Sequence, residues 1–161
     1  MPMPHPPMTS PPQPPSPKAP ITECNCLAVR QAARRITQFY DALLAPSGLR
    51  TTQYSILVRL KRSGPMTINA LARELVMDRT TLGRNILPLE REGLIATRPG
   101  RTDRRSKELH LTETGAAKLR DAAGGWRDAQ AQFEARFGAE LSAELRMLMR
   151  AVTETELRAA D

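Results

Sequence analysis

The chain is poor in aromatic residues, and this absence excludes some fold classes. Its 161 residues include one Trp, two Tyr and three Phe, and alanine and leucine supply most of its hydrophobic fraction of 40%. Such a composition suits close-packed helices better than a β-sandwich, whose packing relies on Val, Ile and aromatic pairs. The length is sufficient for one domain with its own hydrophobic core. We therefore expect a single, mainly α-helical domain.

Cysteine and histidine are also scarce. The two cysteines, Cys24 and Cys26, lie two residues apart and cannot join distant parts of a fold, which excludes the disulfide framework of a secreted protein. The two histidines, His5 and His110, are widely separated and do not complete a four-ligand zinc set. We expect no metal site, and we interpret His110 as a strand residue.

Targeting and catalytic signals are missing as well. The chain has no basic start followed by an apolar stretch and no run of about 18 apolar residues, so we expect a cytoplasmic protein without signal peptide or membrane span. It also lacks a Gly-rich phosphate loop and a plausible nucleophile triad. Neither an enzyme nor a bound cofactor is expected.

Basic residues outnumber acidic ones, and they are unevenly distributed. The net charge is +7 and the pI is about 10.2, which favours a polyanionic partner because Lys and Arg release counterions from phosphate backbones. Residues 79–107 contain eight basic and three acidic side chains, whereas residues 112–161 contain seven basic and nine acidic ones. This local concentration is typical of a nucleic-acid-binding face.

Proline is concentrated at the N-terminus. Ten of the fourteen prolines fall within residues 1–20, beside Ser, Thr and Gln, so residues 1–22 are predicted to be a disordered tail. A polyproline ligand for a partner domain is the alternative. Two helices are predicted next, at about 24–45 and 52–61, from apolar residues spaced by three and four.

Two N-caps then define a helix-turn-helix. Thr67 can cap a short helix whose apolar residues include Leu71, and Asp78 can cap the next helix, which places Leu82, Ile86 and Leu89 on one stripe. Only a few residues separate the two helices. This pattern holds the second helix at a large angle, so that it projects outwards.

A β-hairpin with a basic tip is predicted at 94–111, and two long helices follow. Thr112 can cap the first of them, and Gly138 separates it from the last. Gly124 and Gly125 weaken the middle of the first of these helices, where we expect a bend. Pro88 is expected to bend the recognition helix.

Candidate DNA-binding residues lie on the helix after Asp78 and at the hairpin tip. Those facing away from the apolar stripe can bond base edges or phosphates: Arg79, Thr80, Thr81, Arg84 and Asn85. The tip adds Arg101, Arg104 and Arg105, which can enter the negative minor groove. Asp103 is expected to pair with a neighbouring arginine, with turn formation as the alternative.

Together these residues resemble the MarR family of winged-helix regulators, over about Cys26 to Leu157. The specific segments are Thr67-Ile-Asn-Ala-Leu-Ala, Asp78-Arg-Thr-Thr-Leu, Leu89-Glu-Arg-Glu-Gly-Leu-Ile, Asp103-Arg-Arg and Leu111-Thr-Glu-Thr-Gly. The resemblance implies a mainly α winged helix-turn-helix fold with a small β-hairpin wing, its DNA-binding lobe at 51–111. Residues 23–46 and 112–161 would be dimerisation helices. It also implies a homodimer on a pseudo-palindrome, with Arg105 in the minor groove.

The resemblance further implies a signal that releases DNA. Members of the family commonly release it when a phenolic or acyl ligand enters a cleft, which Arg34, Arg35, Phe39, Tyr40 and Tyr54 would line here. A subset senses peroxides through a cysteine in the first helix, and the spacing of Cys26 and Tyr40 matches that subset. Arg30 stands where the subset has a second tyrosine. A helix N-terminus and Arg30 would favour the reactive thiolate of Cys26.

Several functions remain open at this point. The first is a transcriptional repressor released by a small-molecule effector. The second is a thiol-based redox regulator that acts through Cys26. The alternative for the two cysteines is that Cys26 is a small buried hydrophobic residue and that Cys24 has no role. The third is an architectural DNA binder without sequence preference, for which basic charge alone would suffice.

Overall fold

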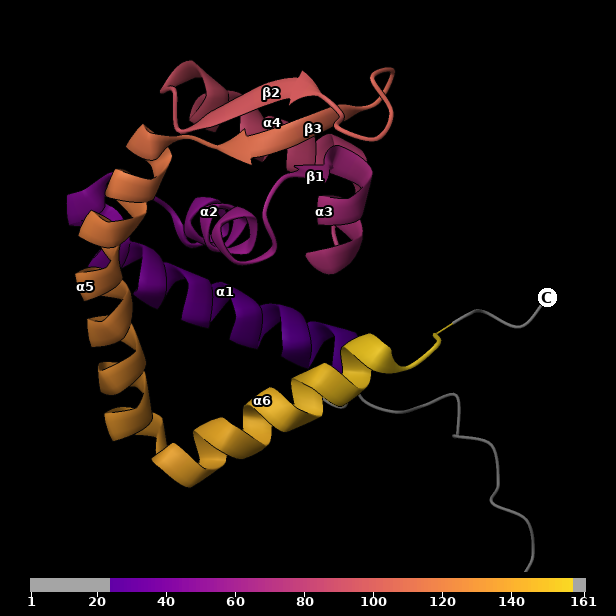
Figure 1. The fold of residues 1–161 in the computed structure, drawn as a ribbon. Coiled ribbons are helices and arrows are strands. Elements are labelled where there is room, and N and C mark those ends of the chain that lie inside the picture. The colour runs from indigo at the N-terminus through magenta and orange to yellow at the C-terminus, as the bar shows by residue number, and fades with distance from the viewer. Residues whose placement is uncertain (1–23, 158–161) are drawn as a thin grey trace, which may run out of the picture. The chain divides into compact units, whose positions relative to one another are not determined.

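The computed structural model describes residues 24–157 (Figure 1). The predicted disordered tail, residues 1–22, lies outside the described residues. Helices run from α1 (Asn25–Leu44) and η2 (Ala45–Ser47) through α2 (Thr51–Ser63), α3 (Ile68–Glu74) and α4 (Arg79–Arg91) to α5 (Glu113–Phe137) and α6 (Ala139–Glu154). The strands are β1 (Met66–Thr67), β2 (Ile95–Pro99) and β3 (Lys107–Leu111). The chain divides into two units, Met1–Ile36 and Thr37–Asp161, and the second holds the whole fold from the last turns of α1 onwards.

The helices begin at the predicted capping residues. The Thr67 hydroxyl accepts from the backbone N–H of Ala70 at 3.2 Å, and the Asp78 carboxylate accepts from that of Thr81 at 2.8 Å. These bonds satisfy N–H groups that have no partner within a first helical turn. The helix-turn-helix predicted from the sequence is therefore confirmed as α3 and α4.

The recognition helix α4 ends at a glycine. Gly93 has φ +70°, and the backbone N–H of Leu94 reaches back to the carbonyl of Leu89 at 2.8 Å, which is the geometry of a Schellman cap. Pro88 lies within α4, where it removes one hydrogen bond, but the helix continues through it to Arg91. The bend at Pro88 stays a prediction.

The wing is a small antiparallel sheet in the order β1-β3-β2. The predicted hairpin is β2 paired with β3, with Ile95 opposite Leu111 and Pro99 opposite Lys107. The third strand, β1, pairs with β3 through Met66 and Thr67. The sequence did not predict β1, because two residues are too few to show the alternation of a strand.

One hydrophobic core lies between the wing, α2, α3 and α4, and the last turns of α1 and the first half of α5 close it. Its fully buried members are all aliphatic: Leu44, Ile56, Leu57, Leu71, Leu82 and Leu89. The stripe predicted on α4 is confirmed, since Leu82, Ile86 and Leu89 are buried. In α2, Ile56 is buried in addition to the residues spaced by three and four, so this helix buries a wider face than a single stripe.

The long helix α5 continues through Gly124 and Gly125 (Figure 1). We expected a bend there, but Gly125 has a different role, since a Cβ atom on it would lie 2.4 Å from the carbonyl oxygen of Leu43. Gly125 therefore lets α5 pack directly on the last turn of α1. The predicted break at Gly138 is confirmed, because Gly138 has φ +101° and separates α5 from α6.

Candidate nucleic-acid interface

The recognition helix α4 divides its residues between core and surface. Its apolar stripe is buried, whereas the four residues at its N-terminal end and on its outer face are exposed: Arg79, Thr80, Thr81 and Arg84. Asn85 is half-buried. Five of the residues predicted to contact DNA are thus brought together on one half of one helix.

Some of these groups are already engaged within the helix. The hydrogen bond from Thr81 to the Asp78 carboxylate lowers the pKa of Asp78 below its ordinary value. The side-chain amide of Asn85 donates to the carbonyl of Thr81 at 2.8 Å. Within the described chain, the guanidinium groups of Arg79 and Arg84 form no ion pair. Arg79 and Arg84 are thus the charged groups that the N-terminal half of α4 leaves available to a ligand.

Asp103 organises the tip of the wing. Its carboxylate accepts the backbone N–H of Arg105 at 2.9 Å, and its carbonyl accepts the backbone N–H of Ser106 at 3.0 Å. In the part of the chain that the structure describes, no arginine side chain forms an ion pair with it. The expected pairing with a neighbouring arginine is therefore replaced by the alternative, turn formation, because the short loop brings a backbone donor to the carboxylate first.

Gly100 keeps this tip compact. A Cβ atom at Gly100 would lie 2.2 Å from the hydroxyl oxygen of Ser106 and 2.6 Å from the carbonyl oxygen of Asp103. The backbone N–H of Gly100 donates to the carbonyl of Ser106 at 2.8 Å. The closed loop leaves the predicted wing arginines exposed: Arg101, Arg104 and Arg105.

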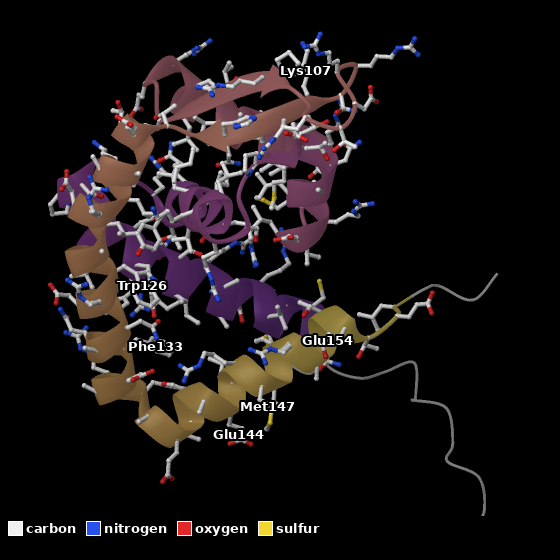
Figure 2. All side chains as sticks on the ribbon, in the orientation of Figure 1. Lys107, Trp126, Phe133, Glu144, Met147 and Glu154 are labelled. Carbon is white, nitrogen blue, oxygen red and sulfur yellow. The ribbon has the colours of Figure 1, made fainter. Side chains whose placement is uncertain are left out.

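Two basic residues of the wing were not singled out from the sequence. Arg98 on β2 and Lys107 on β3 are exposed at the tip end of the hairpin, and Figure 2 shows Lys107 at its outer edge. The charge count of residues 79–107 contained both, but strand periodicity drew attention to Leu109 and Leu111 instead. A link to α4 was also missed, in which the Thr97 hydroxyl donates to the Glu90 carboxylate.

The five predicted effector residues fall into separate environments. Phe39 and Tyr40 pack edge to face at 5.9 Å, and Phe133 lies 6.5 Å from the Tyr40 ring. The Tyr40 hydroxyl donates to the side-chain oxygen of Gln130. Burial raises the pKa of Tyr40, the Glu134 carboxylate adds to this rise, and Arg146 opposes it.

The other effector candidates lie elsewhere. The Tyr54 ring stacks on Trp126 at 6.2 Å with an interplanar angle of 14°, and burial raises the pKa of Tyr54 (Figure 2 labels Trp126 and Phe133 on α5). Arg34 and Arg35 are exposed residues of the first unit. Phe39, Tyr40 and Tyr54 belong to the second unit, and an effector site lined by all five residues stays a prediction.

Both cysteines carry exposed, free thiols. Cys26 lies in the first turn of α1 and Tyr40 in the last turns of the same helix. The exposure of Cys26 in the single chain differs from the alternative in which it is a small buried hydrophobe.

His110 is a strand residue of β3, as predicted. Its Nε2 atom is buried without a hydrogen bond, 3.8 Å from a carboxylate oxygen of Glu108. Across residues 24–157 no group of three potential metal ligands is present, and no helix there has the length and apolar character to cross a membrane.

A helix with a buried apolar stripe and an exposed polar N-terminal half, followed by a basic hairpin, defines a winged helix-turn-helix DNA-binding protein. The sequence model of the MarR family matches residues 49–107. The chain belongs to this family, and it is a transcriptional regulator rather than a member of an enzyme family.

Relatives and solved structures support this assignment. The chain is 33% identical over 93 residues to the uncharacterized HTH-type transcriptional regulator YwoH of Bacillus subtilis, covering 58% of this chain and 67% of that protein. It is 30% identical over 91 residues to the organic hydroperoxide resistance transcriptional regulator of the same species, covering 56% and 62%. The structure of the Mycobacterium tuberculosis regulator MosR in complex with DNA matches with 36% identity and a TM-score of 0.71, covering 84% of this chain and all of that one.

Proposed function

We propose that the protein represses transcription by binding a pseudo-palindromic operator as a homodimer, and that a small molecule releases it. The observation that carries the proposal is the division of α4, whose buried stripe fixes the helix while its N-terminal half presents polar side chains to solvent. In helix-turn-helix proteins this half enters the major groove. The unpaired N–H groups of the first turn add affinity for phosphate.

Each residue of α4 has a distinct part in this proposal. The guanidinium of Arg84 can bond guanine through two donors, and the Thr80 and Thr81 hydroxyls can bond base edges or phosphates. Arg79, at the first helical position, lies beside the backbone donors that favour phosphate. Asn85 donates one of its two amide hydrogens to the Thr81 carbonyl, so the second hydrogen and the side-chain oxygen remain for a base.

The wing supplies the second contact. Arg105, with Arg101 and Arg104, extends from a loop whose shape Asp103 and Gly100 fix. A narrow minor groove concentrates negative potential and attracts inserted arginine side chains. We assign Arg105 to the minor groove and Asp103 to the turn that presents it.

The dimer is supported by the surface of α6. In the single chain α6 exposes a stripe of apolar side chains: Leu141, Leu148 and Val152 are 54%, 51% and 45% exposed. Apolar patches of this kind mark interaction sites. A second copy, packed through residues 23–46 and 112–161, would cover them and set two recognition helices one DNA turn apart, about 34 Å.

Competition binding tests the proposal against an architectural role. The DNA upstream of the gene that encodes the chain competes with random DNA of equal length at two salt concentrations. A regulator keeps a specificity ratio of roughly 10³ or more after the electrostatic part of its affinity is screened. Equal affinity for all sequences would show a nonspecific architectural binder instead.

Arg84→Ala tests the site itself. If Arg84 reads a base, the substitution costs about 1 to 3 kcal/mol and relaxes the sequence preference at one position. Arg91→Ala is the matched control, because Arg91 is an exposed arginine in the last turn of the same helix. An equal loss on every sequence would make Arg84 a phosphate contact.

The effector is proposed to be an aromatic or acyl acid held by Arg34 or Arg35 and by the rings of Phe39, Tyr40 and Tyr54. The chain has one tryptophan, Trp126, which stacks on Tyr54, so its fluorescence reports on ligands that displace this ring. We expect aromatic acids or their thioesters to change this fluorescence and to release the operator. Release without a change in fluorescence would place the ligand away from Tyr54.

A second candidate is a peroxide-sensing regulator that acts through Cys26. It is favoured by the exposure of the Cys26 thiol and by the relative named for organic hydroperoxide resistance. An exposed thiolate is the form that peroxides oxidise to a sulfenic acid. Cys26→Ser should abolish peroxide-triggered release, with Cys24→Ser as the matched control. Unchanged release in Cys26→Ser would exclude this thiol.

A further inference from the structure

We propose that Thr112 and Gly115 are positioning residues that hold the recognition helix in register with the dimerisation helix α5. Neither residue is among the predicted DNA contacts, and both act through the backbone of Gly93 and Leu94. The inference rests on the proposed function, because register matters only if two recognition helices must reach two half-sites at once.

Gly115 is the point at which α5 meets the DNA-binding lobe. It is buried, and a Cβ atom on it would lie 2.1 Å from the carbonyl oxygen of Leu94 and 2.8 Å from a methyl carbon of Leu111. Carbon and oxygen atoms that are not bonded do not approach so closely, and the obstacle is backbone rather than a flexible side chain. Any side chain at this position must therefore move α5 away from Leu94.

Leu94 also closes the cap at the end of the recognition helix. Its N–H donates to the carbonyl of Leu89 in α4 at 2.8 Å, and its own carbonyl accepts the backbone N–H of Thr112 at 3.1 Å. One residue thus joins the last turn of α4 to the first turn of α5. A displacement of α5 at Gly115 is therefore passed to α4 through the backbone of a single residue, Leu94.

Thr112 fixes this joint from the other side. Its hydroxyl donates to the carbonyl of Gly93 at 2.7 Å, with the Leu94 carbonyl 3.1 Å away, and accepts the N–H of Gly115 at 2.9 Å. The same hydroxyl therefore caps α5 and bonds the segment that ends α4. Serine would keep these bonds, and valine would lose them in nearly the same volume.

Gly125 provides a second close backbone contact of α5, ten residues after Gly115. A Cβ atom at Gly125 would lie 2.4 Å from the carbonyl oxygen of Leu43, whereas one at the neighbouring Gly124 would meet nothing within 4 Å. The contacts at Gly115 and Gly125 are about 15 Å apart along the helix. The stretch of α5 between them is held against α1 at one end and against the lobe at the other.

The expected consequence follows from hydrogen-bond geometry. Base contacts work over a narrow range of about 2.7 to 3.2 Å. A subunit with a displaced α4 can still dock on one half-site, because it moves as a whole to restore its contacts. A dimer cannot do so at both half-sites simultaneously, and it loses the avidity of about 10² to 10⁴ that linked sites provide.

The experiment compares an operator with two half-sites and a DNA duplex that carries one. Gly115→Ala, Gly125→Ala and Thr112→Val should each lose at least about tenfold of their affinity for the two-site operator and little for the single site. The preferred half-site spacing, tested in steps of one base pair, should also weaken or shift. Gly124→Ala and Thr112→Ser are the matched controls and should behave as the unaltered protein does.

The outcomes are distinguishable. Equal losses on one-site and two-site DNA, or no loss on either, would overturn the positioning role. If the unaltered protein does not prefer two half-sites, the proposed dimeric regulator is wrong, and this inference fails with it. If Gly115→Ala does not fold, as circular dichroism would show, Thr112→Val with its serine control decides the question.

Discussion

The predicted DNA-binding lobe, residues 51–111, and the arm formed by α5 and α6 differ in the exposure of their leucines. In the lobe, Leu57, Leu71 and Leu89 are fully buried, whereas in α6 of the arm Leu141 and Leu148 are more than half exposed. The basic side chains of the lobe, in contrast to its leucines, are exposed on α4 and the wing. The core of the lobe is thus complete within one chain, with residues such as Leu44 and Ala122 added from outside residues 51–111.

This difference separates two sources of stability. A core buried within one chain contributes at any protein concentration, whereas an apolar surface covered by a second copy contributes only when that copy is bound. The lobe is therefore suited to present DNA-binding residues rigidly, and the arm is suited to assembly. Substitutions that act on one region and leave the other intact can test this separation.

The largest expected effect is that of Leu148→Glu in the arm. A charge in the covered apolar stripe should give a monomer, and operator affinity should fall by about 10² to 10³ because the second half-site is lost. Sedimentation and DNA titration measure both effects. Ala143→Glu carries the same charge on the opposite side of α6 and should remain dimeric. A dimeric Leu148→Glu protein would show that α6 is not the interface.

Leu57→Ala should produce the next largest effect, this time in the lobe. Leu57 is fully buried, so its truncation should lower the free energy of unfolding by about 2 to 5 kcal/mol. Urea unfolding at several protein concentrations should show the same loss throughout. Leu148→Ala, in contrast, should cost stability that depends on concentration. A concentration-dependent loss for Leu57→Ala would contradict a self-contained lobe.

A smaller effect of opposite sign is expected at Val76. This residue ends α3 with φ +51°, a left-handed conformation that a β-branched side chain rarely adopts, and its side chain is 72% exposed. Val76→Gly should raise the free energy of unfolding by about 1 kcal/mol because the strain is relieved and no core contact is lost. Gly93→Val, at the equivalent position after α4, should destabilise the lobe. A destabilised Val76→Gly would show that the valine makes a contact in the dimer.

The smallest effect concerns pH. The pKa of Asp78 lies below its ordinary value of 3.8, mainly because its carboxylate accepts hydrogen bonds from Thr81. Its capping contribution is therefore complete above pH 3.8 and is lost as the pH falls through the lowered value. Asp78→Asn keeps a capping oxygen that does not titrate. The difference in melting temperature between the two proteins should be constant above about pH 5 and change below pH 3.8; a difference that stays constant throughout would exclude the carboxylate.

Features that depend on bonds between near neighbours could be predicted from the sequence alone. Thr67, Asp78 and Thr112 cap helices because their oxygens reach backbone donors three residues ahead, and the stripe of Leu82, Ile86 and Leu89 follows from the helical repeat. These interactions connect neighbours in the chain, so a linear pattern contains them. The division of α4 into a core-facing stripe and an outer polar face could be read in the same way.

The tertiary structure decided what depends on residues far apart in the chain. Strand β1 exists only because β3 pairs with it, and the need for glycine at positions 115 and 125 arises from the carbonyls of Leu94 and Leu43. The Asp103 carboxylate accepts a backbone N–H rather than pairing with an arginine side chain. The reason is that the closed wing loop, and not the order of charged residues in the sequence, decides which donor is nearest. No periodicity encodes such contacts, since the space they occupy is defined only when the elements have packed.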